Sequence, residues 1–161
     1  MHPRAAEFGE RARERHGVEV DVLEFDSGTE TAAAAAEAVG CETAAIASTI
    51  VVSLVGGDRD GELVAAITSG ANRLDLDAVA ERFGADGAEM GDPGRIREVV
   101  GWSIGGVPPI CHDAALSTVF DPTLATYDAV YGAAGTPSAV FSIDPEELIE
   151  LADATVVDLT E

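Results

Sequence analysis

Residues 49–70 of the chain are TIVVSLVGGDRDGELVAAITSG, two apolar runs separated by a loop of glycine and charged residues. Valine, isoleucine and threonine favour extended backbone, and a glycine-containing loop between two such runs is typical of a β-hairpin. The pattern predicts a central strand over residues 49–55, a turn over 56–61 and a returning strand over 62–70.

Helices are predicted on both sides of this hairpin, where amphipathic or alanine-rich runs end at glycine. These runs cover residues 4–16, 29–40 and 74–84, and a turn is predicted over 26–29. Two more helices are expected after aspartate–proline pairs, because aspartate caps a helix and proline fits its first turn. The pairs are Asp92-Pro93 and Asp144-Pro145.

Further strands are predicted over residues 18–25, 117–121, 138–143 and 154–159. Helices and strands do not alternate in strict βαβ order, so a purely parallel sheet is not expected. We therefore expect an α+β fold with a curved, mixed, partly closed sheet flanked by helices, in a single domain over residues 1–161.

Charge is the most unusual property of the composition. The chain has 30 acidic and nine basic residues, a formal net charge of −21, and all nine basic residues are arginine. An acidic surface without lysine resembles proteins of organisms that live in near-saturating salt. At molar salt the Debye length is only ~3 Å, which screens both self-repulsion and repulsion from RNA. The charge is therefore interpreted as adaptation of the whole surface rather than as a binding signal.

Targeting and metal signals are weak. The apolar runs have strand length, well short of the ~18 residues that a membrane span needs, and the charged N-terminus lacks an apolar signal core. The cysteines lack zinc-site spacing and the three histidines are scattered. We expect a cytoplasmic protein with no metal, organic cofactor, membrane partner or DNA partner.

Residues 101–112, GWSIGGVPPICH, hold three glycines and two prolines and predict a shaped loop. Glycine lets the backbone approach a substrate closely, and proline stiffens the loop. Fixed backbone N–H donors suit a site that stabilises a developing oxyanion. On this loop alone, an ordinary turn is the favoured interpretation.

Five segments, taken in order, resemble the YbaK family, also called the prolyl-tRNA-synthetase-associated family. They are TAAAAAEAVGC (31–41), TIVVSLV (49–55), SGANRLDLDAVAERFGA (69–85), GWSIGGVPPICH (101–112) and AAGTPSAVF (133–141). The resemblance implies a stand-alone domain that hydrolyses the ester of tRNA mischarged with a small amino acid such as alanine or cysteine. The implied partners are the 3′ end of aminoacyl-tRNA and, as a further candidate, an aminoacyl-tRNA synthetase.

By the same resemblance, the glycine–proline loop faces the amino-acid end of the substrate. The residues expected to act there are Gly105, Gly106, Val107 and Pro109. Substrate contacts are expected from Val52, Ser53, Ser69, Asn72, His112 and Gly135. For Thr68, Ser69 and Asn72, turn formation and helix capping is an equally good interpretation.

The chain departs from the family at one position. Family members carry lysine in a pattern like I-V-K-S-L-V, and the stretch aligned to it here is Ile50-Val51-Val52-Ser53-Leu54-Val55, with Val52 at the lysine position. Either Arg73 or Arg95 replaces the missing charge, or the chain is a non-catalytic module that binds tRNA or a synthetase.

Two further features leave alternatives open. Cys111-His112 suggests an ester or thioester hydrolase with a thiol nucleophile, but adjacent side chains on extended backbone point to opposite faces. His112 is a better candidate for a polar group that lines the pocket. Trp102 is interpreted as a core residue, with a stacking platform for the terminal base as the alternative.

Overall fold

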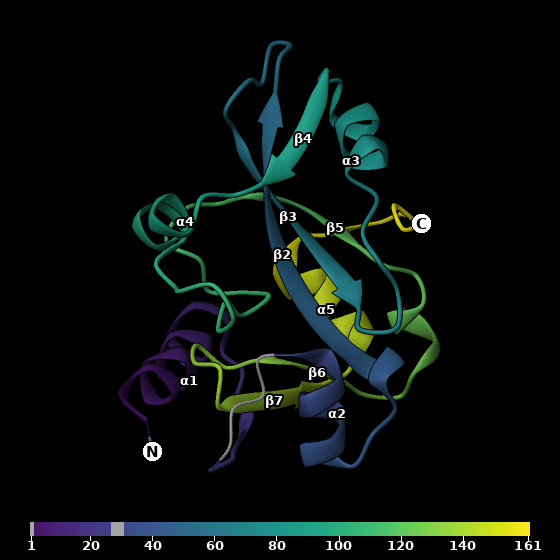
Figure 1. The fold of residues 1–161 in the computed structure, drawn as a ribbon. Helices are drawn as coiled ribbons and strands as arrows, with labels where there is room; N and C mark the ends of the chain where they lie inside the picture. The colour runs from purple at the N-terminus through teal and green to yellow at the C-terminus, as the bar shows by residue number, and fades with distance from the viewer. Residues whose placement is uncertain (1, 27–30) are drawn as a thin grey trace.

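The structure is a computed structural model that describes residues 2–26 and 31–161 (Figure 1). Its helices are α1 (Pro3–His16), α2 (Ala32–Val39), α3 (Leu76–Phe83), α4 (Pro93–Val100) and α5 (Pro145–Ala152), with 3₁₀ turns at Thr43–Ala45 and Leu124–Thr126. Its strands are β1 (Asp21–Glu24), β2 (Ile46–Val55), β3 (Leu63–Ser69), β4 (Gly87–Met90), β5 (Ser117–Phe120), β6 (Val130–Ala133), β7 (Ala139–Ile143) and β8 (Thr155–Val156).

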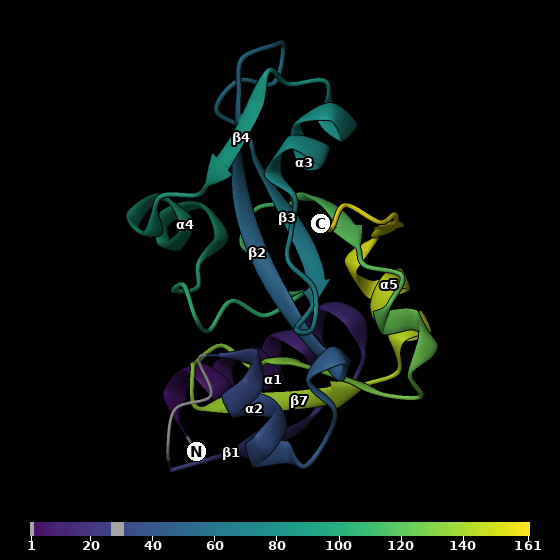
Figure 2. The same cartoon turned by 45° about the vertical axis from the view of Figure 1, so that its right-hand side comes forward.

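The strands form one mixed sheet in the order β1-β7-β6-β2-β3-β5-β8, and β4 pairs separately with β2. The pairs β2–β6, β3–β5 and β5–β8 are parallel, and the others are antiparallel. Figures 1 and 2 show β2 and β3 running steeply across the direction of β7, so the sheet is curved. The predicted α+β class and the mixed, curved sheet are confirmed.

The helix boundaries follow local capping chemistry. Helix α1 ends at Gly17, whose φ of 66° is left-handed and suits glycine. Asp92 and Asp144 accept hydrogen bonds from backbone N–H groups at the starts of α4 and α5, as their aspartate–proline pairs predict. Helix α2 is capped by Thr31. The start predicted for this helix at residue 29, and most of the turn over 26–29, lie outside the described residues.

The central hairpin forms as predicted, but β2 is longer than its apolar run. It begins at Ile46 because Ile46 and Ala47 pair in parallel with Tyr131 and Gly132 of β6. Strands β4 and β6 were not predicted as strands, since glycine and alanine weaken their local preference for extended backbone. Both form because β2 supplies a partner edge.

The largest core cluster packs α1 and the glycine–proline loop against α5 and strands β2, β3, β5, β6 and β7. Trp102 is 0% exposed, its Nε1 donates to the Cys111 carbonyl at 2.9 Å, and Phe8 meets its ring edge-on. The guanidinium groups of Arg4 and Arg11 lie 4.1 Å and 5.0 Å from the centre of its ring. Trp102 is therefore a core residue, and a fully buried ring has no free face for a nucleotide base. None of the helices in the described ranges has the length and apolar character needed to cross a membrane.

Candidate functional site

A cavity of about 220 Å³ lies where the sheet has a gap along one edge of β2. Strand β6 covers this edge at Ile46 and Ala47, and β4 covers it from Val52 to Val55. Between them, no described strand pairs with this edge. Residues 46–51 form one wall of the cavity, and the start of α2, the glycine–proline loop and residues 131–140 form the others.

Thr49 presents unpaired polar groups at this gap. Its Oγ1 is a buried side-chain atom with no hydrogen-bond partner among the described residues. In an antiparallel strand, successive residues direct their N–H and C=O groups to opposite edges. The carbonyl of Val51 accepts from Gly91 on the gap side, so the backbone groups of Thr49 face that side too. A buried unpaired hydroxyl costs free energy, which a ligand in the cavity can recover.

The glycine–proline loop closes the opposite side of the cavity. Gly105 and Val107 line it, and no hydrogen bond between described residues uses their backbone N–H groups. Gly105 has a φ of +89°, a left-handed conformation that strongly favours glycine. These two N–H groups fit the sequence-based expectation that the loop offers backbone donors at the site.

Three other predicted residues hold the loop in place and do not line the cavity. A Cβ on Gly106 would lie 2.8 Å from Cα of Thr136, and Pro109 packs where a Cβ on Gly132 would lie 3.1 Å from its ring. A Cβ on Gly135 would lie 2.6 Å from the Trp102 ring. The absence of a Cβ at Gly106, Gly132 and Gly135 lets the loop, the turn at residues 134–138 and β6 pack directly against one another.

His112 closes the loop on itself. Its Nε2 lies 2.6 Å from the Pro108 carbonyl oxygen, and the side chain does not line the cavity. Burial lowers the pKa of His112 below its usual value, and Arg15 adds to this, while the bond to Pro108 and nearby Asp113 oppose it. A neutral imidazole is a suitable hydrogen-bond donor to the Pro108 carbonyl.

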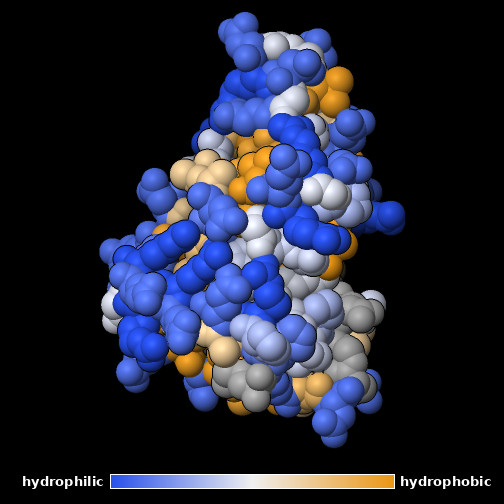
Figure 3. Space-filling model, turned by 90° about the vertical axis from the view of Figure 1, so that its left-hand side faces the viewer, coloured by the Kyte–Doolittle hydropathy of each residue, from blue (hydrophilic) through white to orange (hydrophobic). Residues whose placement is uncertain are grey.

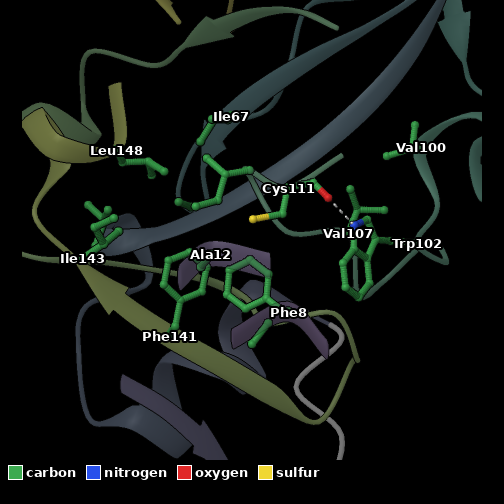
Figure 4. Packing of buried hydrophobic residues seen from close by; sticks show 14 of the residues in the cluster. Phe8, Ala12, Ile67, Val100, Trp102, Val107, Cys111, Phe141, Ile143 and Leu148 are labelled. Atoms are coloured by element: carbon green, nitrogen blue, oxygen red, sulfur yellow. Dashed lines mark hydrogen bonds between the residues drawn. The ribbon is translucent and has the colours of Figure 1, made fainter. Parts of the chain in front are cut away.

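Cys111 is a poor candidate nucleophile. Its side chain is 4% exposed, and Figure 4 shows its sulfur turned toward Phe8 and Phe141 in the core. Burial raises the pKa of the thiol, an effect that Arg15 and Arg11 oppose. Since the thiolate is the reactive form, the structure gives no support to a thiol mechanism.

Ser69 and Asn72 belong to a buried network that the sequence did not reveal. The carboxylate of Asp121 accepts from the Ser69 N–H at 3.1 Å, from Asn72 Nδ2 at 2.9 Å and from the Thr123 N–H at 2.9 Å. Asp121 is only 4% exposed. The network ties the end of β3 to the end of β5 away from the cavity, so the turn-forming interpretation is favoured. The sequence does contain an indication of this network, because Asp121, which is followed by proline, ends the predicted strand over 117–121.

Comparison with known proteins identifies the family. The family model described as an aminoacyl-tRNA editing domain matches residues 26–151. The chain belongs to the aminoacyl-tRNA editing domain family. The YbaK-like resemblance found in the sequence is thereby confirmed.

Individual relatives agree with this family assignment. The uncharacterized protein YwhH of Bacillus subtilis (strain 168) is 29% identical over 86% of this chain and 85% of its own length. A solved structure whose description proposes a trans-editing enzyme for prolyl tRNA synthetase has a TM-score of 0.90 at 35% identity, covering 100% of this chain and 99% of the other. The structure of hypothetical protein APE2540 has a TM-score of 0.83 at 27% identity, over 96% and 99% of the two chains.

In this editing domain, the position assigned to the family lysine lies outside the cavity. Val52 is 0% exposed and packs with Leu54, Val64 and Val79 in a second core cluster. The prediction that Val52 faces the substrate is therefore corrected. Ser53, its neighbour, pairs with β3 and β4 and does not line the cavity either.

A second alignment of the lysine pattern agrees better with this site. The pattern I-V-K-S-L-V also fits Ile46-Ala47-Ser48-Thr49-Ile50-Val51, which places Ser48 at the lysine position. Ser48 lines the cavity, and Val52 lies four residues farther along the strand. The apolar run that predicts this strand begins only at Thr49, so the sequence pattern alone favours the alignment that places Val52 at the lysine position.

None of the described arginines lines the cavity. The side chain of Arg73 is 87% exposed and pairs with Glu161, and Arg95 donates to the Gly61 carbonyl. Among the described residues that line the cavity, none is charged. In the described part of the chain, no group of three histidine, cysteine, aspartate or glutamate side chains could hold a metal ion.

Proposed function

We propose that this chain, acting as a single domain, hydrolyses the ester of tRNA mischarged with a small, uncharged amino acid. One observation supports this most directly. The cavity, whose described lining residues are uncharged, lies between the edge of β2 at Thr49 and the backbone N–H groups of Gly105 and Val107, which no hydrogen bond between described residues uses. Family membership supports editing in general, and the cavity suggests which substrate class enters it.

The size and lining of the cavity favour a single small amino acid. Its volume of about 220 Å³ is below the roughly 300–1,000 Å³ of pockets that enclose drug-sized ligands. Alanine, valine and isoleucine predominate among the described residues of its walls, and the residues with hydroxyl groups there are Thr31, Ser48, Thr49, Tyr131 and Thr136. A charged substrate side chain would meet no opposite charge there, so its desolvation would be costly.

The proposed reaction uses fixed backbone groups. Water attacks the ester carbonyl carbon, the C–O bond to the ribose breaks, and the ribose oxygen leaves with a proton. The N–H groups of Gly105 and Val107 would stabilise the negative charge that develops on the carbonyl oxygen. The carbonyl and hydroxyl of Thr49 would bind the α-amino group and orient the ester. The partner is thus the 3′ end of aminoacyl-tRNA, in the cytoplasm, with or without a synthetase.

The first experiment is release of amino acid from alanyl-, cysteinyl- and seryl-tRNA by the purified protein in molar KCl. Thr49→Val is the informative variant, because it keeps the shape of the side chain and removes the unpaired hydroxyl. We expect this variant to fold at least as stably as the wild type and to hydrolyse its preferred substrate about 10-fold more slowly. Equal turnover by both proteins would contradict the role of Thr49.

A second candidate function is binding of aminoacyl-tRNA without hydrolysis, and one observation favours it. No charged side chain lines the described cavity, whereas the resemblance implies a lysine at such a site. Under this alternative, the wild type binds aminoacyl-tRNA without releasing the amino acid, and a Ser48→Lys variant gains hydrolysis. Release by the wild type would remove the alternative.

A further inference from the structure

The most exposed large hydrophobic side chains of the described residues lie at the cavity. Met90 is 56% exposed and Ile104 is 50% exposed, and both line the cavity. Val55 and Val156 are also exposed but do not line it. A side chain that lines a cavity while half of it is exposed lies at the opening. Met90 and Ile104 therefore form an apolar rim at the cavity mouth.

Isolated exposed hydrophobic residues are common and need no explanation. This pair is different because its members come from separate parts of the chain and both line the same cavity. Met90 ends β4, and Ile104 belongs to the glycine–proline loop. Figure 3 shows that much of the face that carries α1 and α4 is hydrophilic, with few hydrophobic patches.

The proposed function indicates which part of the aminoacyl-tRNA contacts this apolar rim. An amino acid seated in the cavity remains joined through its ester to the terminal ribose of the tRNA. A cavity of about 220 Å³ that holds the amino acid has no room for a nucleoside as well. We propose that Met90 and Ile104 are the apolar platform for the terminal nucleoside of aminoacyl-tRNA, an inference that rests on the proposed function.

The chemistry of the rim suits a nucleobase. Every base has a π-face that packs on apolar or aromatic side chains without sequence preference, and the methionine thioether makes favourable contacts with aromatic rings. Phosphate attraction is a weak alternative here, since molar salt screens charges and no charged residue is among the described residues lining the cavity. Apolar contacts persist at salt concentrations that screen charges.

The test is binding of a hydrolysis-resistant probe, 3′-alanylamino-3′-deoxyadenosine, in molar KCl. Alanine N-methylamide, which lacks the nucleoside, is the comparison ligand. Met90→Gln and Ile104→Thr should each raise the Kd of the nucleoside probe about tenfold and leave the Kd of the short ligand unchanged. Val156→Thr, a change at an exposed valine away from the cavity, is the matched control and should alter neither.

Three outcomes decide the inference. Selective weakening of the nucleoside probe supports the platform. Unchanged binding of this probe, or equal weakening of both ligands, overturns it, even when the wild type hydrolyses alanyl-tRNA and the proposed function stands. A wild type that hydrolyses no mischarged tRNA contradicts the proposed hydrolysis. The binding assay still tests the role of Met90 and Ile104, because failure of the wild type to bind the nucleoside probe overturns the inference.

Discussion

Gly106 packs so closely against Thr136 that a Cβ on the glycine would lie 2.8 Å from the Cα atom of the threonine. This contact joins the two loops that face the open edge of β2. A side chain at residue 106 would push Gly105 and Val107 away from their positions in the cavity wall. The contact thus connects a packing requirement with the geometry of the proposed oxyanion donors.

Gly106→Ala should lower both stability and activity. The added methyl group meets backbone atoms, which cannot move aside cheaply, so we expect a loss of about 1–3 kcal/mol in the free energy of unfolding. Gly9→Ala is the matched control, because a Cβ there meets nothing within 4 Å in the middle of α1. That control should gain about 0.5–1 kcal/mol. Urea unfolding and alanyl-tRNA hydrolysis measure both effects, and a fully stable Gly106→Ala protein would contradict the predicted clash.

Lysine should have opposite effects at the two candidate positions of the family pattern. Val52→Lys places an unpaired ammonium in a core cluster, and we expect a loss on the order of 4–5 kcal/mol or failure to fold. Ser48→Lys places the ammonium at the cavity, where water can reach it, and should leave the protein folded. Thermal unfolding of both variants is the measurement, and a stable Val52→Lys protein would contradict the buried position of Val52.

Asp121→Ala should be strongly destabilising although it leaves the cavity walls intact. It removes the acceptor of the Ser69 and Thr123 N–H groups and of one of the two hydrogen bonds from Asn72 Nδ2, which keeps its bond to Thr123 Oγ1. We expect a loss of about 3–5 kcal/mol. Asp121→Asn keeps one acceptor oxygen and should lose about half as much. Similar stability of both variants and the wild type in urea would contradict the structural role.

His112 should make stability depend on pH. Burial lowers its pKa in the folded protein, so the unfolded chain binds the proton more readily. Its contribution to stability is complete above a pH of about 6.5, the usual histidine pKa, and is lost as the pH falls from there toward the lowered folded pKa. Asp113 and Arg15 are the charged groups that act on this imidazole, and their effects on its pKa oppose each other. His112→Gln should remove this part of the slope, measured by urea unfolding in molar KCl, and an unchanged slope would contradict it.

Cys111→Ala should separate the ester-hydrolase alternative from the editing proposal. The buried thiol is expected to be unreactive toward a thiol reagent in the folded protein, and the variant should keep its hydrolytic activity. We expect a stability loss of about 1–2 kcal/mol from the smaller side chain. Complete loss of hydrolysis in a folded variant would reinstate a thiol mechanism.

Interactions between neighbouring residues in the sequence were sufficient to predict much of the fold. Glycines after helical runs and aspartate–proline pairs before them depend on a few neighbouring residues, so the C-terminal end of α1 and the starts of α4 and α5 were predicted closely. The hairpin of β2 and β3 was also predicted from a single continuous stretch of sequence. The ordered motifs also indicated the family, which the family model over residues 26–151 confirms.

Only the tertiary structure decided which residues meet in the cavity. Ser48 and Val52 lie on the same face of β2, separated by about 13 Å along the strand. Residues of α3 cover the face at Val52, while the gap between β6 and β4 leaves Ser48 and Thr49 at the cavity. A strand pattern specifies faces but not what covers each segment of a face, because that depends on contacts between residues far apart in the chain.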